Sequence, residues 1–316
     1  MNTTLRPTQS KVASPTVFLL LAVTFFVSAR CEGQEAAQKT FKTAQQAVEA
    51  LIAANRDNDI AALNQILGPD ASTLVSSGDE TQDKNDRANF VKLYEAHHRL
   101  LSSGSGKLAL VVGKNEWPLP IPLVKSNGEW RFDSADGVKE LLYRRIGSNE
   151  LAAIKVCRAL YQAQLDYAAS GHDGNAPGVY AQRFRSQPGT QNGLYWEVTE
   201  GEPESPAGPL VADADAEGYE QGTRHPYYGY YFRILKAQGP NARGGAKDYI
   251  IDGKMTGGFA ILAYPAEHGA SGVMTFMVSR HGSLFQKDLG DSTAETARAI
   301  KAFDPDLSWT RLPSAN

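Results

Sequence analysis

Histidine and carboxylate side chains are the residues of this sequence that could carry acid–base chemistry. The six histidines are scattered without metal-site spacing, and no nucleophile elbow, HExxH zinc motif, phosphate loop or dinucleotide fingerprint is present. His225 is the best candidate for a general base, because it opens a predicted strand that Asp248 and Asp252 follow. Asp252 also precedes Gly253, a pair typical of a hairpin turn. We therefore predict no catalytic residue, no metal site and no cofactor.

The segment best suited to binding is the irregular stretch over residues 173–226. It is rich in Gly and Pro and longer than a structural connection needs, and such segments often hold sites. Aromatic side chains beside arginines and the acidic run 200–204 could form a surface for carbohydrate or peptide. Alternatively, the aromatic side chains hold the segment against the body of the protein. The predicted binding residues are Arg183, Arg185, Tyr195, Trp196, His225 and Tyr228.

A sheet and a helix must position these residues. Alternating apolar residues predict an antiparallel sheet near the end of the chain. A helix over residues 151–169, with Asn149 as its N-cap, presents an apolar stripe containing Cys157, which must pack on that sheet. The predicted strands are 227–235, 255–265, 272–279 and 283–289.

The sequence pattern before this helix, over residues 41–146, predicts an α+β domain. Helices from residue 41 onward, over 60–67 and over 86–101, precede strands at 107–112, 121–125 and 129–132. This order resembles the cone-shaped fold of nuclear-transport-factor-like, ketosteroid-isomerase-like and cystatin-like proteins. Such cones often enclose a pocket, but element order alone carries no site residue over. The aromatic and histidine side chains that could line the pocket, or instead form core, are Tyr94, His97, Trp117 and Trp130.

The second part, residues 147–312 with the insertion 173–226, resembles the globular head of type IV pilins and pseudopilins. The likeness lies in NELAAIKVCRALYQAQLDYAASG, a long helix, and in GFAILAYPAEHGASGVMTFMVSRHGSLF, paired strands with a turn. A pilin begins with an apolar assembly helix, whereas here a separate domain precedes Glu150. The resemblance therefore implies a pilin-like, helix-on-sheet fold without filament assembly.

Several longer motifs resemble one uncharacterised bacterial family, the domain of unknown function 2950. They include GVYAQRFRSQPGTQNGLYW, GEPESPAGPLVADADAEGY and HPYYGYYFRILKAQGP, and the resemblance extends from about Phe41 to Trp309. It implies an exported protein of Gram-negative bacteria and no assigned activity. The family often has a histidine where this chain has Tyr228, which weakens any catalytic role there.

The start of the chain predicts export. Arg6 and Lys11 precede an apolar run that is too short to cross a bilayer, so residues 1–29 resemble a signal peptide. We expect the mature chain to start near Arg30, with a disordered lead-in over residues 30–40. Cys31 invites a lipid anchor, but Arg30 stands where a lipobox needs a small residue. We expect a periplasmic or otherwise exported protein without a membrane-spanning segment.

Composition narrows the choice of partners. Loss of Arg6 and Lys11 with the signal peptide would shift the formal net charge from -3 to -5, and a mildly acidic chain without a basic stripe does not favour nucleic acid. We predict a non-catalytic binding or assembly component of the cell envelope, its partner an envelope protein or a glycan. The alternative is a periplasmic hydrolase, or a small-ligand-binding enzyme that uses the cone pocket or the inserted segment.

Overall fold

The computed structural model describes residues 38–104, 106–199, 201–219 and 225–313. The predicted signal peptide, its cleavage site near Arg30, and Cys31 lie outside these ranges. The fold is α+β with antiparallel sheets, as expected from the sequence. Among the described helices, none is long and apolar enough to cross a membrane.

Four helices and one 3-10 turn open the described chain. Their starts follow from side chains that accept the first free backbone N–H groups: Thr43 caps the first helix, Asp59 the second and Asp79 the last. The apolar faces of the first two helices form the core of this half with Phe132 of the following sheet. The elements are α1 Ala44–Arg56, α2 Ile60–Leu67, η1 Pro69–Ala71, α3 Ser72–Val75 and α4 Glu80–Ala96.

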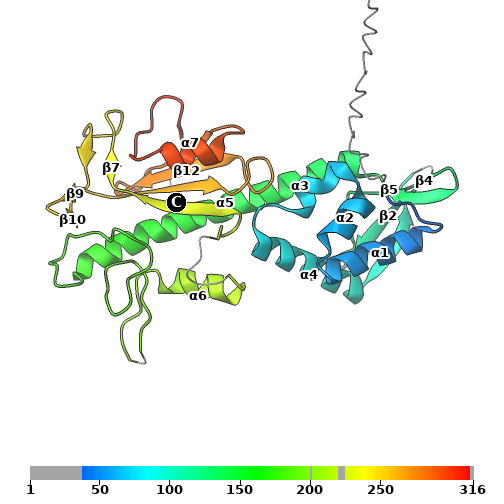
Figure 1. Ribbon diagram of the computed structural model, residues 1–316, viewed down its shortest axis with the longest axis horizontal. Coiled ribbons are helices and arrows are strands. Elements are labelled where there is room, and N and C mark those ends of the chain that lie inside the picture. Colours follow the sequence, from blue (N-terminus) through cyan, green and yellow to red (C-terminus); the bar gives the residue numbers. More distant parts are fainter. Residues whose placement is uncertain (1–37, 105, 200, 220–224, 314–316) are drawn as a thin grey trace, which may run out of the picture. The chain divides into compact units, whose positions relative to one another are not determined.

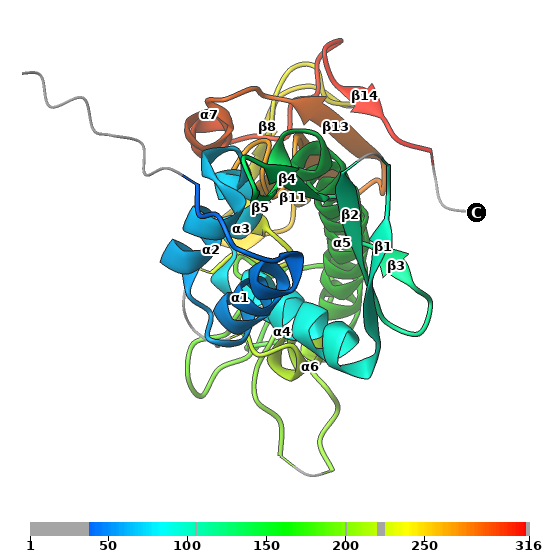
Figure 2. The same cartoon turned by 90° about the vertical axis from the view of Figure 1, so that its right-hand side faces the viewer.

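The first sheet follows directly and packs beside these helices (Figure 2). Asn127 and Gly128 form the tight turn between its last two strands, as predicted. The predicted helix over 86–101 is wrong at its end, because the chain leaves the helix at His97 and pairs as an edge strand. The strands are β1 His98–Ser102, β2 Lys107–Val112, β3 Trp117–Pro118, β4 Leu123–Ser126 and β5 Glu129–Phe132.

A single long helix, α5 Ser134–Ser170, contacts both halves of the described chain (Figure 1). Its first turns pack on η1 and α3, and its later turns pack on the second sheet. The predicted helix start after Asn149 is wrong: Asn149 is a buried mid-helix residue that bonds to other segments. Gly147 and Ser148 imitate a helix start in sequence, yet α5 continues through them. The predicted division at residues 146–147 therefore falls inside a helix.

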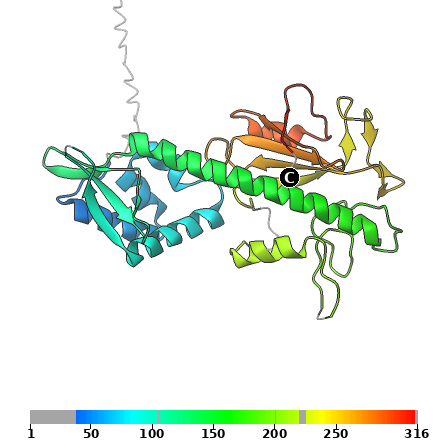
Figure 3. The same ribbon diagram turned by 180° about the vertical axis from the view of Figure 1, so that it is seen from behind.

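The second sheet has the strand order β14-β13-β12-β11-β6, entirely antiparallel. α5 covers one side of it and α7 Thr293–Ala299 the other, so all six residues of β11 are buried (Figures 1 and 3). The four predicted strands are confirmed, with shorter bounds. They are β6 Tyr230–Leu235, β11 Ala260–Pro265, β12 Met274–Ser279 and β13 Leu284–Asp288, and the added edge strand is β14 Thr310–Arg311.

Short elements complete this half. Asp252 and Gly253 form the hairpin turn expected from their sequence. In the described part of the inserted segment there is one helix, α6 Gly208–Ala216. Two short strand pairs extend from the sheet, β7 Ala237–Gln238 with β8 Lys247–Asp248 and β9 Ile250–Ile251 with β10 Lys254–Met255.

Candidate binding pocket

A cavity of about 570 Å³ lies in the first half of the chain, between α4 and the first turns of α5. This volume lies within the range of small-molecule pockets, roughly 300–1,000 Å³. Its walls are mainly apolar and come from α1, α2, α3 and the 117–121 segment as well. Representative apolar lining residues are Leu51, Leu63, Leu67, Leu119, Ile121 and Leu141.

One face of α4 supplies the polar side of the pocket. Asp83, Asp86, Arg87 and Phe90 follow one another at helical steps of three, one and three, so all four lie on the face that lines the cavity. The only described α4 residues that are buried are Asp83 and Val91. A buried aspartate on an otherwise polar helix is unusual, because a buried carboxylate is expensive without partners.

Asp79, the N-cap of α4, joins this half to the second half. Its Oδ1 accepts the Gln82 N–H at 3.1 Å, while its Oδ2 accepts the Tyr219 hydroxyl at 2.9 Å and the Gly229 N–H at 2.8 Å. Asp79 is 1% exposed. Gly229 has φ +71, and a Cβ there would lie 2.7 Å from Asn149 Nδ2, so glycine allows this close approach.

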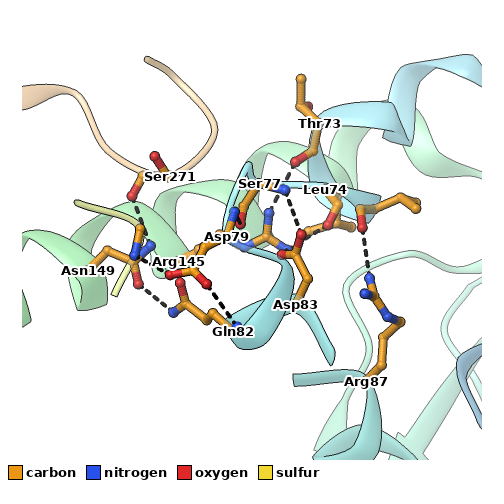
Figure 4. A network of polar contacts seen from close by, with 12 residues as sticks. Thr73, Leu74, Ser77, Asp79, Gln82, Asp83, Arg87, Arg145, Asn149 and Ser271 are labelled. Carbon is orange, nitrogen blue, oxygen red and sulfur yellow. Dashed lines mark hydrogen bonds and ion pairs between the residues drawn. The ribbon is translucent and has the colours of Figure 1, made fainter. Parts of the chain in front are cut away.

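Asp83 is buried with one oxygen satisfied and the other not. Its Oδ2 accepts the Ser77 N–H at 2.9 Å (Figure 4). Its Oδ1 is a buried atom without a hydrogen-bond partner among the described residues. The closest cation, Arg145 Nη2, lies 3.9 Å from Oδ1, too far for a hydrogen bond.

The two arginines beside Asp83 donate to backbone carbonyls instead. Arg145 donates to the Thr73 carbonyl at 3.1 Å and to the Leu74 carbonyl at 2.5 Å, and Arg87 donates to the Val75 carbonyl at 2.9 Å. These carbonyls belong to α3, whose last turn lacks intrahelical donors. The arginines therefore cap α3, and Arg145 also forms an ion pair with Asp83.

A chain of amides leaves a second acceptor unpaired in the pocket. Asn149 Nδ2 donates to the Ser271 carbonyl at 2.9 Å, which fixes the amide orientation of Asn149 (Figure 4). Asn149 Oδ1 then accepts from Gln82 Nε2 at 2.7 Å. Gln82 Oε1 is consequently left buried without a partner. Two buried acceptors without a hydrogen-bond partner, Gln82 Oε1 and Asp83 Oδ1, thus belong to residues beside the pocket.

Burial shifts the pKa values of charged residues in and beside the pocket. Burial raises the pKa of Asp79 above its ordinary value, and the hydrogen bonds from Gln82, Gly229 and Tyr219 offset this in part. Asp86 is exposed as a residue, but desolvation of its carboxyl group raises the pKa of Asp86, with Arg145 acting in the opposite direction. Withdrawal from water lowers the pKa of Arg87.

The predicted binding residues lie elsewhere, in the second half. The Arg185 guanidinium lies 4.7 Å from the centre of the Tyr195 ring, and both residues line a small apolar cleft of about 230 Å³. Trp196 packs against other rings instead, with centroids 5.0 Å from His172 and 6.4 Å from Tyr167. The structure therefore brings Arg185 and Tyr195 together.

The other three predicted residues are not part of that cleft. Arg183 and His225 are exposed. Tyr228 has φ +50, and its hydroxyl donates to Glu217. No hydrogen bond between described residues joins His225 to Asp248 or Asp252.

The remaining histidine contacts lie outside the pocket. His97 is 3.7 Å from Glu116, and His268 is 2.9 Å from Asp288. His98 stacks on Tyr94, with ring centroids 3.7 Å apart. Trp117 is the predicted aromatic residue that does line the cavity. Within the described ranges, no group of three His, Cys, Asp or Glu side chains is arranged to hold a metal ion.

The sequence predictions missed Asp79, Gln82, Asp83 and Arg145. The predicted helix began at Asp86, which assigned the preceding acidic residues to a loop. The spacing of Asp83, Asp86, Arg87 and Phe90 was the signal available, since it places all four residues on one face of a helix. The contacts of Asp79 with Tyr219 and Gly229 span 140 and 150 residues, and no local pattern predicts them.

Fold and cavity together define an α+β protein with a mainly apolar pocket edged by aspartate and arginine side chains. The sequence profile of a family described as protein of unknown function (DUF2950) matches residues 38–312. The chain therefore belongs to this family. The family resemblance stated from the sequence is therefore confirmed, while the comparisons give no support to the pilin-like one. No curated protein and no solved structure matches the chain.

Proposed function

We propose that this protein is a non-catalytic binding protein whose pocket between α4 and α5 holds a small ligand with an apolar body. The observation that carries this is the cavity of about 570 Å³, with mainly apolar walls and charged side chains of α4 and α5 at one side. Apolar walls supply affinity by removing ligand surface from water, and a few placed polar atoms set orientation.

A binding role agrees better with the pocket than hydrolysis does. A general base must lie within about 3 Å of a partner in a concave site. The described histidine–carboxylate ion pairs, His97 with Glu116 and His268 with Asp288 and Asp291, involve residues that do not line the cavity. The alternative of a hydrolase has no such pair in the pocket to support it.

The setting of this function is part of the proposal. The signal-like residues 1–29 support export, so the ligand would be met in the periplasm or outside the cell. The family resemblance to Gram-negative exported proteins points the same way.

The inserted segment remains a second proposed binding surface, for an envelope protein or glycan. The observation in its favour is the apolar cleft beside Arg185 and Tyr195. Its volume of about 230 Å³ is below that of most ligand pockets, so it suits one side chain or one sugar ring better than a whole small molecule.

Titration with the neutral apolar fluorophore N-phenyl-1-naphthylamine tests the main proposal. We expect a saturable fluorescence increase with the wild-type chain. Ser148→Trp places an indole among the lining residues at an exposed position of α5, and should weaken binding at least tenfold. Ala159→Trp is the matched control, because Ala159 is also exposed on α5 but lines neither cavity. No saturable signal, or equal binding by both variants, would contradict the proposal.

A further inference from the structure

The strand β6 is an edge of the second sheet, because the strand order ends at it. Its register with β11 pairs Tyr230 with Pro265, and one step further the Ala266 N–H donates to the Gly229 carbonyl at 2.8 Å. Hydrogen-bonded and non-hydrogen-bonded pairs alternate along an antiparallel ladder, so the odd-numbered residues of β6 bond to β11. The backbone groups of the even-numbered residues therefore face away from the sheet.

The outer side of β6 is paired at both ends but not in the middle. At one end Tyr227 and Tyr230 exchange two backbone hydrogen bonds, of 2.8 and 3.1 Å. At the other end the Lys236 carbonyl accepts the Tyr249 N–H at 2.9 Å. Within the described ranges, no hydrogen bond reaches the outward N–H and C=O groups in between, over residues 232–234. This stretch, the open edge, is free to pair with another strand.

The small apolar cleft adjoins the open edge. Tyr227 lies opposite Tyr230 on the outer side, so the position opposite Phe232 is two residues further along. Side chains two residues apart in a strand point to the same face of a sheet. Tyr227 and Phe232 both line the cleft of about 230 Å³. A side chain placed opposite Phe232 would therefore point into that cleft.

These two features together favour an extended polypeptide as the occupant. Its backbone supplies N–H and C=O groups at the spacing of a strand, and an alternate side chain fills the cleft. A glycan lacks this regular alternation of donors and acceptors. A second copy of the chain fits less well, because the segments at Tyr227 and Tyr249 that flank its own β6 would meet those of the first copy.

We propose, resting on the second proposed surface, that the open edge binds an extended segment of another protein as an added strand. One large apolar side chain of that segment occupies the cleft between β6, α5 and α6. The partner of the inserted surface is then a polypeptide rather than a glycan. No described residue lines both this cleft and the main cavity, so the two sites are separate.

Fluorescence anisotropy with labelled seven-residue peptides tests the proposal. The probe alternates threonine and valine around a central phenylalanine, and its control has alanine at the centre. With the full chain, we expect saturable binding of the phenylalanine peptide and at least tenfold weaker binding of the alanine peptide. N-methylation removes a backbone donor, so it should abolish binding at one set of alternate peptide residues and leave it unchanged at the other.

Two substitutions on α6 test the place of the apolar side chain. Val211→Trp fills the cleft from a residue that lines it, and should weaken binding of the phenylalanine peptide at least tenfold. Ala212→Trp is the matched control, because Ala212 is exposed on the same helix and does not line the cleft. Urea denaturation checks that both variants are folded.

Hydrogen exchange of the backbone amides reports on the added strand directly. In the free chain, the amides of Phe232 and Ile234 should exchange faster than those of Arg233 and Leu235, which bond to β11. Addition of the phenylalanine peptide should slow the exchange of Phe232 and Ile234 at least tenfold.

The outcomes separate this inference from the proposals on which it rests. Absence of saturable peptide binding, equal effects of N-methylation at both sets of residues, or unchanged exchange at Phe232 and Ile234 would overturn the added strand. Protection of these amides that rises with protein concentration in the absence of peptide would show a second copy at the edge and overturn it too. Binding of maltoheptaose but of no peptide, lost in Val211→Trp, would leave the surface as a glycan site. If neither binds, the second surface fails as well, while the naphthylamine titration tests the main cavity independently.

Discussion

Asp79→Ala is expected to lower the free energy of unfolding by about 3 kcal/mol, because it leaves several buried donors without an acceptor. The Tyr219 hydroxyl and the Gly229 N–H would lose their shared oxygen, and α4 would lose its N-cap. Burial raises the pKa of Asp79 because it disfavours the charged carboxylate, and the hydrogen bonds from these donors offset part of that cost. Urea denaturation of the full chain measures the change.

Asp59→Ala is the matched control for this prediction. Asp59 caps α2 in the same way, accepting the Ala62 N–H at 2.9 Å, but it is exposed and joins no distant segment. Its loss should cost only about 1 kcal/mol, the ordinary value of an N-cap. Equal losses for the two substitutions would show that the contacts of Asp79 with Tyr219 and Gly229 add nothing to stability.

Two glycines of α5 are expected to respond to alanine with opposite signs. A Cβ on Gly137 would lie 2.2 Å from the Pro120 carbonyl oxygen and 2.8 Å from the Ile121 nitrogen. These are backbone atoms, which cannot rotate away, so Gly137→Ala should destabilise the protein by about 3 kcal/mol. The same shift would disturb Ile121, which lines the pocket, and should weaken ligand binding as well.

Gly147→Ala provides the opposite case. Nothing lies within 4 Å of a Cβ at this position. Alanine is favoured over glycine inside a helix by up to about 1 kcal/mol, so a modest gain in thermal stability is expected. A loss at Gly147 would argue against an unbroken α5, and a neutral effect at Gly137 would argue against its close contact with the 120–121 backbone.

Local patterns predicted much of the fold. The apolar stripe around Cys157 and the alternation in β6, β11, β12 and β13 were sufficient to place a helix on an antiparallel sheet. These elements bury one or both faces, so their periodicity is visible in the sequence.

The failures have a common physical cause. α5 was expected to begin at residue 151 because Gly147, Ser148 and Asn149 resemble a cap, but in the fold Asn149 satisfies its amide with Gln82 and Ser271. Tertiary hydrogen bonds here override a local signal. The pocket was not predicted for the same reason, because its polar residues come from both α4 and α5 and lie together only in the folded chain.

The pocket is also directly connected to the second half of the chain. Gln82 contacts Asn149, which holds the Ser271 carbonyl, and neighbouring Asp79 holds Gly229 just before β6.

Methyl-resolved NMR of the isotope-labelled full chain titrated with N-phenyl-1-naphthylamine tests the central claim most directly. The claim predicts saturable shifts in the methyl signals of Leu63, Leu119 and Ile121, which line the main cavity. Signals of Val156 and Leu160, beside the smaller cleft, should stay in place. Shifts confined to Val156 and Leu160, or saturating shifts in neither group, would contradict the assignment of the α4–α5 pocket as the ligand site.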